Sequence, residues 1–195
     1  MVRWASRAAV AMAVVQIGYG VLACAFRYPE ITDRPFEALW ALANAGMILN
    51  IAVWLSIRVA TPRLALVGGG LAIVGHLGRV AVSLVLEARP DTSADGPIVG
   101  SILFIFVGLA LLGVATLRAR RLAGPSAWAP LFVLAGGLLV APLYSTQKVT
   151  HFILLGLLWG ATWLYMAVVG LRHVDDAARP RPAAAMVMAG LADGR

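Results

Sequence analysis

The sequence has little of what a soluble enzyme requires: one cysteine, one lysine and nine acidic residues in a chain of 195. The single Cys24 excludes a disulfide within the chain and any metal site made of several cysteines. Charged residues make up only 13% of the chain, whereas hydrophobic residues make up 61%, which is too apolar for a fold with a polar exterior. The composition therefore indicates a membrane protein.

Several sequence signatures of specific chemistry are also missing. The chain has no HExxH pair, no pair of aspartates within an apolar run and no phosphate-binding glycine loop in a polar context. No aspartate or glutamate lies deep in an apolar run, as a proton-coupled carrier would need. The net charge of +7 is spread over several loops without interleaved aromatic residues, so we expect no nucleic-acid partner. Together these absences favour a non-enzymatic protein.

The feature that is present is a series of six long apolar runs. Each is close to the roughly 20 residues that a helix needs to cross about 30 Å of hydrocarbon. The predicted spans are residues 8–26, 36–57, 64–86, 98–117, 128–146 and 149–171, with a kink at Pro142. The sequence thus predicts an all-α, polytopic membrane protein with six transmembrane helices in residues 1–172, followed by a flexible cytoplasmic tail, residues 173–195.

The distribution of arginine predicts the orientation. With the N-terminus in the cytoplasm, eleven arginines fall on the inner side, namely Arg3, Arg7, Arg58, Arg63, Arg118, Arg120, Arg121, Arg172, Arg179, Arg181 and Arg195. The outer loops then hold four basic residues, Arg27, Arg34, Arg89 and Lys148. This bias predicts that both termini are cytoplasmic. Abundant alanine and arginine are typical of a GC-rich bacterial gene, so we expect the plasma (inner) membrane of a bacterium.

The first span shares features with a signal peptide, and Cys24 stands in a context similar to a lipoprotein cleavage box. A signal's apolar region is usually shorter, and five further spans follow. We therefore expect that the first helix is not cleaved from the protein.

Candidate functional residues are the few polar groups inside the spans. Arg79 is the most costly, because a mid-helix arginine costs roughly 2.5 to 3.5 kcal/mol on insertion scales. His76, Arg79, Ser83 and Glu87 recur every three or four residues, which predicts one polar stripe on a helix. We expect Arg79 to face inward toward a partner.

Similar depths in the membrane suggest which groups join this stripe. Asn44 lies close to the depth of Arg79, Gln16 lies close to that of His76, and His151 enters from the same side. The sequence predicts a ligand-binding pocket in the outer half of the bundle made by Arg79, His76, Asn44, Gln16, His151, Ser83 and Glu87, with Arg79 as the anchor for an anion. The alternative is that these groups only satisfy one another and fix the arrangement of the helices.

A haem held between His76 and His151 is a further possibility. Its two axial nitrogens must lie at nearly one depth. From the span boundaries, His76 lies about 15 Å below the outer surface and His151 only about 3–7 Å, at 1.5 Å per residue. We therefore expect no haem or other cofactor. A hydrolase is disfavoured too, because no acid is placed to orient His76 toward Ser83.

Small residues predict how the helices approach one another. Ala5, Ala9 and Ala13 repeat every four residues in the first span, and Gly156 and Gly160 form a GxxxG motif in the last. These surfaces serve either helix packing within the chain or contact with a membrane partner subunit or a second copy.

Six spans, about 190 residues, cytoplasmic termini and the Ala5, Ala9, Ala13 pattern together resemble the substrate-binding subunits of energy-coupling-factor vitamin transporters. The resemblance implies that the alanine surface docks onto a shared transmembrane partner and that a small molecule binds near the outer face. Spans that end in Leu-Arg, at Arg118 and Arg172, also resemble many uncharacterised small multi-pass bacterial membrane proteins.

The sequence therefore favours an integral membrane protein that binds a small molecule or a lipid headgroup, associated with transport. The alternatives are a structural or assembly subunit of a membrane complex, and an intramembrane enzyme or haem protein that uses His76 and His151. Membrane lipids are expected partners in every case.

Overall fold

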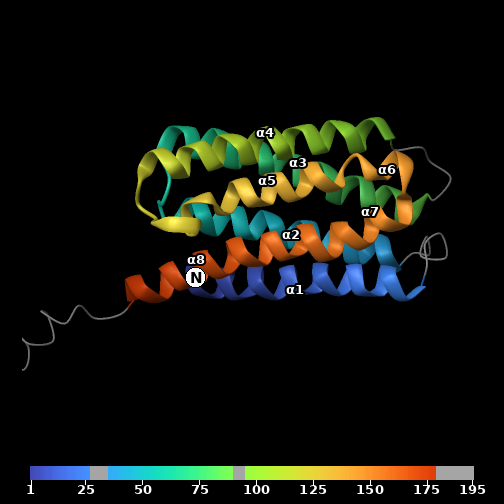
Figure 1. The fold of residues 1–195 in the computed structure, drawn as a ribbon, viewed down its shortest axis with the longest axis horizontal. Coiled ribbons are helices and arrows are strands. Elements are labelled where there is room, and N and C mark those ends of the chain that lie inside the picture. Colours follow the sequence, from blue (N-terminus) through green and yellow to red (C-terminus); the bar gives the residue numbers. More distant parts are fainter. Residues whose placement is uncertain (27–34, 90–94, 179–195) are drawn as a thin grey trace, which may run out of the picture.

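The structure, a computed structural model, describes residues 1–26, 35–89 and 95–178. These residues are helical almost throughout and include no strand. Figure 1 shows the long helices side by side in one bundle, in which α1, α2, α3 and α4 run in alternating directions and α7, η2 and α8 continue one another. The elements are α1 (Val2–Phe26), α2 (Pro35–Ser56), α3 (Pro62–Ala88), α4 (Asp95–Ala119), the 3-10 helix η1 (Gly124–Trp128), α5 (Ala129–Val140), α6 (Leu143–Thr146), α7 (Lys148–Leu154), the π-helical segment η2 (Leu155–Trp159) and α8 (Gly160–Ala178).

Helix length and composition support the predicted membrane fold. Five helical stretches of the described chain are long and apolar enough to cross a membrane: Val2–Ala25, Ala38–Ser56, Pro62–Leu86, Gly96–Ala119 and Thr150–Ala178. The fold class is therefore that of an all-α, multi-pass membrane protein. Proline favours the first turn of a helix, because its missing N–H has no partner there anyway, and Pro35 and Pro62 begin α2 and α3.

The fifth predicted span, residues 128–146, differs from the structure. The apolar helix there covers Gly124–Val140, which is shorter than the other five stretches. The regular helix α5 ends at Val140 because Pro142 has no N–H to continue it, and the short α6 begins directly after this proline. The predicted break in the helical hydrogen bonding at Pro142 is thus present.

The last helix extends beyond the predicted span. α8 continues past residue 171 to Ala178, so residues 173–178, which we expected in the tail, are helical. Within this extension Asp175 forms an ion pair with Arg3 of α1, and the distance between Arg3 Nε and Asp175 Oδ1 is 2.9 Å. Residues 179–195 of the expected tail lie outside the described residues.

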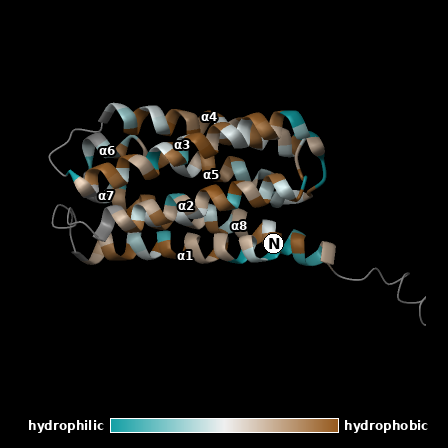
Figure 2. Cartoon of the chain, turned by 180° about the vertical axis from the view of Figure 1, so that it is seen from behind, coloured by the Kyte–Doolittle hydropathy of each residue, from teal (hydrophilic) through white to brown (hydrophobic). Residues whose placement is uncertain are grey.

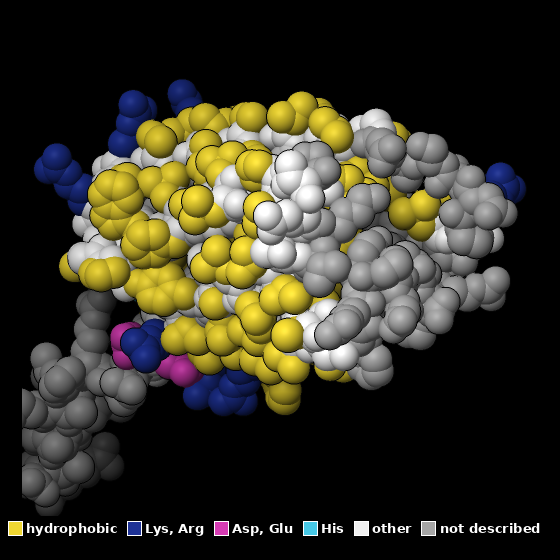
Figure 3. Space-filling model, turned by 45° about the vertical axis from the view of Figure 1, so that its right-hand side comes forward, with side chains coloured by type: hydrophobic (Ala, Val, Ile, Leu, Met, Phe, Trp, Pro, Cys, Tyr) yellow, Lys and Arg dark blue, Asp and Glu magenta, His cyan; other side chains and the backbone are white. Residues whose placement is uncertain are grey.

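The helices form a layered arrangement. α1 and α8 lie along one side of the bundle and α4 along the opposite side, with α2, α3 and α5 between them (Figure 1). Apolar residues follow the helices along most of their length (Figure 2). Apolar side chains also make up most of the described surface in Figure 3, and the charged side chains lie around its edge. Exposed large side chains such as Leu66 (65%) and Leu139 (68%) indicate a surface made for contact with lipid.

Glycines allow two pairs of helices to approach closely. A Cβ on Gly68 of α3 would lie only 2.6 Å from the backbone nitrogen of Leu112 in α4. A Cβ on Gly156 in η2 would overlap the backbone of Gly20 in α1. In lipid, where apolar contact provides no net drive for association, such close backbone contact holds helices together.

The predicted small-residue surfaces are both used within the chain. Ala9 (2% exposed) and Ala13 (5%) of α1 are buried, and they line a seam with α2. The GxxxG residues Gly156 and Gly160 face α1, near Gly20 and Ile17. These residues therefore make close helix contacts inside one subunit.

Two arginines adopt a backbone conformation that is unusual for residues other than glycine. Arg58 follows α2 with φ of 53°, and Arg120 follows α4 with φ of 50°. Both are in the left-handed region, where a residue with a Cβ is destabilised by roughly 1–2 kcal/mol relative to the right-handed conformation. Glycine is the usual residue directly after a helix for this reason.

Candidate polar-core site

His76 is the central polar group of the bundle and is fully buried in α3. Its Nδ1 lies 2.8 Å from Oδ1 of Asn44 in α2, and Nδ2 of Asn44 donates to the carbonyl of Trp40 at 2.9 Å. A carbonyl can only accept, so this second bond fixes the amide and turns Oδ1 toward the imidazole. His76 therefore carries its proton on Nδ1, and its Nε2 has a free lone pair.

Aromatic rings surround this imidazole. The ring of Trp159 stacks on it with centroids 6.5 Å apart, and the ring of Trp163 meets it edge-on at 5.3 Å. The indole N–H of Trp159 is used elsewhere, because it donates to the carbonyl of Val133 in α5 at 2.9 Å. Within the described part of the chain, Nε2 of His76 and Nε1 of Trp163 are buried without a hydrogen-bond partner.

Arg79 and Ser83 continue the polar stripe toward the end of α3. The guanidinium carbon of Arg79 lies 6.0 Å from the centre of the Trp40 ring in α2, within the range of a cation–π interaction. The partly buried Arg79 thus points across the α2–α3 interface, about 13 Å before the end of the helix at 1.5 Å per residue. The Ser83 hydroxyl is buried (1% exposed) and has no hydrogen-bond partner among the described residues. The side chain of Glu87 lies outside what the structure describes.

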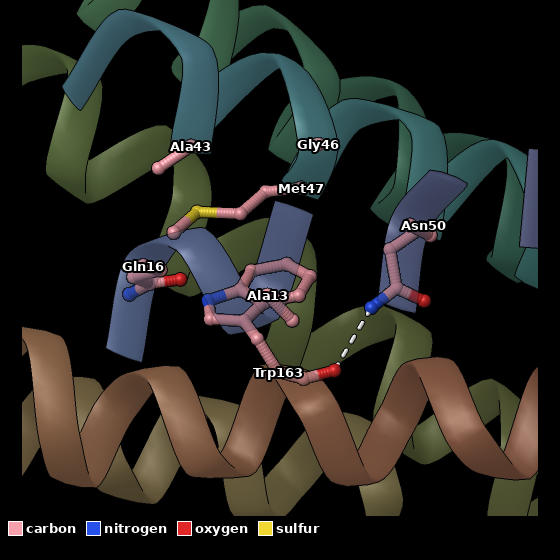
Figure 4. A pocket seen from close by; sticks show the side chains of 8 residues that line it. Ala13, Gln16, Ala43, Gly46, Met47, Asn50 and Trp163 are labelled. Atoms are coloured by element: carbon pink, nitrogen blue, oxygen red, sulfur yellow. Dashed lines mark hydrogen bonds between the residues drawn. The ribbon is translucent and has the colours of Figure 1, made fainter. Parts of the chain in front are cut away.

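A second polar cluster lies where α1, α2 and α8 meet (Figure 4). Gln16 donates from Nε2 to the carbonyl of Leu155 at 3.1 Å, and Asn50 donates from Nδ2 to the carbonyl of Trp163 at 3.1 Å. Their oxygens, Gln16 Oε1 and Asn50 Oδ1, are buried and have no partner within the described ranges. Both side chains and Trp163 line a narrow seam between the helices that has no room for a water molecule.

Trp163 joins the two clusters, because it contacts His76 and also lines the seam with Gln16 and Asn50. We use the name polar core for these side chains together: Gln16, Asn44, Asn50, His76, Arg79, Ser83 and Trp163. The Leu155 carbonyl held by Gln16 begins the π-helical segment η2. π-helical turns are rare and occur often at functional sites, because they disturb the regular hydrogen bonding of the helix.

His151 belongs to a different junction. Its Nδ1 lies 2.9 Å from the carbonyl of Val140, the last residue of α5, and its ring packs edge-on against Tyr144 at 5.3 Å. Since the carbonyl only accepts, His151 donates and fastens α7 to the end of α5. The sequence pattern did not predict this structural role.

The structure thus gives the predicted residues different surroundings. It brings Asn44 and His76 into direct contact, turns Arg79 toward α2 and places Gln16 against Trp163. Asn50, Trp159 and Trp163 were not predicted as site residues. The available signals were an amide within an apolar run and two tryptophans four residues apart in the middle of a span.

Neither a metal cluster nor a known relative helps to identify the site. Groups of three or more His, Cys, Asp or Glu able to hold a metal ion do not occur in residues 1–26, 35–89 and 95–178. Comparisons of the chain with protein-family models, curated proteins and solved structures gave no match.

Proposed function

We propose that this chain is a bacterial inner-membrane protein with cytoplasmic termini and that it binds a small molecule or a lipid headgroup in its polar core, as a non-enzymatic subunit associated with transport. The observation that supports this most is the set of buried hydrogen-bonding atoms without partners in the described chain: Gln16 Oε1, Asn50 Oδ1, His76 Nε2, Ser83 Oγ and Trp163 Nε1. Each such atom costs about 1–3 kcal/mol. A bundle selected for stability alone would replace them with apolar groups, whereas a ligand would satisfy them.

The donors and acceptors among these atoms indicate which hydrogen-bonding groups the ligand carries. Two amide oxygens and the His76 Nε2 accept hydrogen bonds, the Trp163 N–H donates, and the Ser83 hydroxyl does both. The cationic Arg79 at one end of the core favours an anionic group. A molecule with several donors and acceptors and one acidic group fits this pattern.

Access requires a change in the bundle. The seam between α1, α2 and α8 has no room for a water molecule, so binding there needs α1 to separate from its neighbours. The buried Ala9 and Ala13 belong to this seam, and docking of a partner through them is therefore not part of the proposal.

The alternative function is a structural or assembly subunit without a ligand. It is favoured by the hydrogen bonds in which Gln16, Asn50 and His151 each use a side-chain nitrogen to hold a backbone carbonyl of another helix. In that case the polar residues only connect helices.

Arg79→Leu separates the two functions. Purified wild-type protein is extracted, and small molecules that co-purify are identified by mass spectrometry. We expect a stoichiometric molecule with the wild type, loss of that molecule with Arg79→Leu, and an unchanged elution profile of the folded variant. Arg89→Leu, the same substitution at the exposed end of α3, is the matched control and should retain the molecule. A wild type without a bound molecule, or an Arg79→Leu variant that retains the molecule, would reject the binding proposal. If both Arg79→Leu and Arg79→Lys fail to fold, the structural alternative is supported.

Ser83→Ala gives a second test. Without ligand, this substitution should stabilise the protein by about 1 kcal/mol, because it removes a buried hydroxyl without a partner. Ser101→Ala is the control: the Ser101 hydroxyl donates to the carbonyl of Pro97 at 2.7 Å, so its loss should not stabilise the protein. Thermal unfolding in detergent measures both, and equal effects would show that Ser83 is not an unsatisfied group.

A further inference from the structure

Five exposed arginines gather at the end of the bundle where α2 and α4 finish. Arg58 lies in the α2–α3 connection and Arg63 in the first turn of α3, and Arg118, Arg120 and Arg121 lie at the end of α4 and in the connection after it. Residues 56–64 and 117–128 contain no acidic residue. We call Arg58, Arg63, Arg118, Arg120 and Arg121 the arginine rim.

Hydrogen bonds hold the two connections together. Nη1 of Arg121 donates to the carbonyl of Arg58 at 2.7 Å, although the two residues are far apart in sequence. One turn into the bundle, the backbone N–H of Thr61 donates to the carbonyl of Ala115 at 3.1 Å. The arginine rim is therefore a single fixed surface rather than two independent loops.

The backbone at two rim positions is unfavourable for arginine. Arg120 directly follows α4 and Arg58 is the second residue after α2, and both have positive φ near a helix end, where glycine is the usual residue. Cations near helix C-termini interact favourably with the helix dipole, but an arginine inside the last turn provides this without strain, as Arg118 does in α4. Two strained arginines in two adjacent connections suggest that their side chains are required there.

We propose that the arginine rim binds the phosphate of an anionic phospholipid headgroup. Guanidinium groups match phosphate geometry through two parallel hydrogen bonds, and basic surfaces at membrane level recognise acidic headgroups. Apolar side chains lie directly beside the rim on the lipid-facing surface: Leu66 (65% exposed) and Val67 (56%) follow Arg63, and Val114 (38%) precedes Arg118. A phosphate on the rim would place its acyl chains along these residues. Trp128, which is 49% exposed in η1, lies at the same end, as expected for an indole at headgroup level.

The test compares lipid retention by native mass spectrometry. The full-length protein in mild detergent is titrated with phosphatidylglycerol and, separately, with phosphatidylcholine of the same acyl composition. We expect the wild type to retain phosphatidylglycerol preferentially, and the double variant Arg58→Asn/Arg120→Asn to bind it at least about 10-fold more weakly, since each arginine at the membrane surface contributes to acidic-lipid binding. Asparagine tolerates positive φ, so the variant should fold at least as well as the wild type.

The matched control is Arg7→Asn/Arg172→Asn, two exposed arginines of α1 and α8 outside the rim. This variant should retain phosphatidylglycerol like the wild type. An Arg58→Gly/Arg120→Gly variant repeats the test with the residue that such backbone positions favour. Equal binding by rim and control variants would overturn the proposal. Inorganic phosphate that stabilises the protein as much as the lipid would also overturn it, because the rim would then be a site for free phosphate.

Discussion

Replacing Gly156 with valine is expected to leave little folded protein in detergent. Gly156 lies in η2 against Gly20 of α1, and even a Cβ at this position would overlap the backbone atoms of Gly20. A backbone cannot move aside like the end of a flexible side chain, so α1 and η2 must separate. Separation also breaks the nearby hydrogen bond from Gln16 to Leu155. We expect a destabilisation of about 3 kcal/mol or more, which is the upper range for overpacking.

Size-exclusion chromatography and thermal unfolding in detergent measure this effect. Gly70→Val is the matched control, because a Cβ on Gly70 of α3 has open space around it. It should leave the stability nearly unchanged or raise it by less than about 1 kcal/mol, because valine, although β-branched, has a higher helix propensity than glycine. A Gly156→Val protein as stable as the control would mean that α1 and η2 do not cross at these glycines.

A double-mutant cycle on Asn44 and His76 is expected to show strong coupling. Asn44→Leu removes the acceptor of the His76 Nδ1–H, and His76→Leu leaves Asn44 Oδ1 without its donor. Each single change should destabilise the protein by about 1–3 kcal/mol, because a buried polar group loses its partner. The double variant removes both polar groups and should be less destabilised than the sum of the two by about 1–2 kcal/mol.

The same cycle separates binding from folding. The double variant should remain folded, yet it should no longer retain the co-purifying molecule, because Nε2 of His76 is gone. Unfolding titrations of the four proteins provide the energies, and mass spectrometry of the extracts provides the ligand content. Additive energies, within about 0.5 kcal/mol, would show that the hydrogen bond is absent. Full ligand retention by the folded double variant would remove His76 from the site.

The sequence was sufficient for the class of fold because bilayer thickness determines helix length. Runs such as residues 64–86 and 98–117 were recognisable without knowledge of their neighbours, and α3 and α4 extend only a few residues beyond them. The fifth predicted span is divided in the structure, because apolar composition continues through Pro142 although the regular helix α5 ends at Val140 and α6 follows. The extension of α8 was missed because its last turns are polar, as suits a helix that leaves the apolar zone and pairs Asp175 with Arg3.

The site was less predictable, because helical spacing gives the faces of single helices but not the neighbours of each face. His76, Arg79 and Ser83 could be placed on one stripe, and estimated depth suggested Asn44 as a neighbour of Arg79. The structure instead reveals a hydrogen bond between Asn44 and His76, one turn away. Trp159 and Trp163 were missed because nothing in their own segment indicates that their rings reach His76 of α3. His151 was assigned to the pocket from its estimated depth in the membrane, but this depth does not reveal its hydrogen bond to the carbonyl of Val140.

The partners of α1 have a consequence for biosynthesis. α1 packs against α2 and also against η2 and α8, which come much later in the chain, with Gln16 and Gly20 directed at Leu155 and Gly156. Until η2 has been translated, the amide of Gln16 faces lipid or a chaperone instead of its carbonyl. Nascent chains that stop before α7 would display this amide and be recognisable to membrane proteases as unfinished.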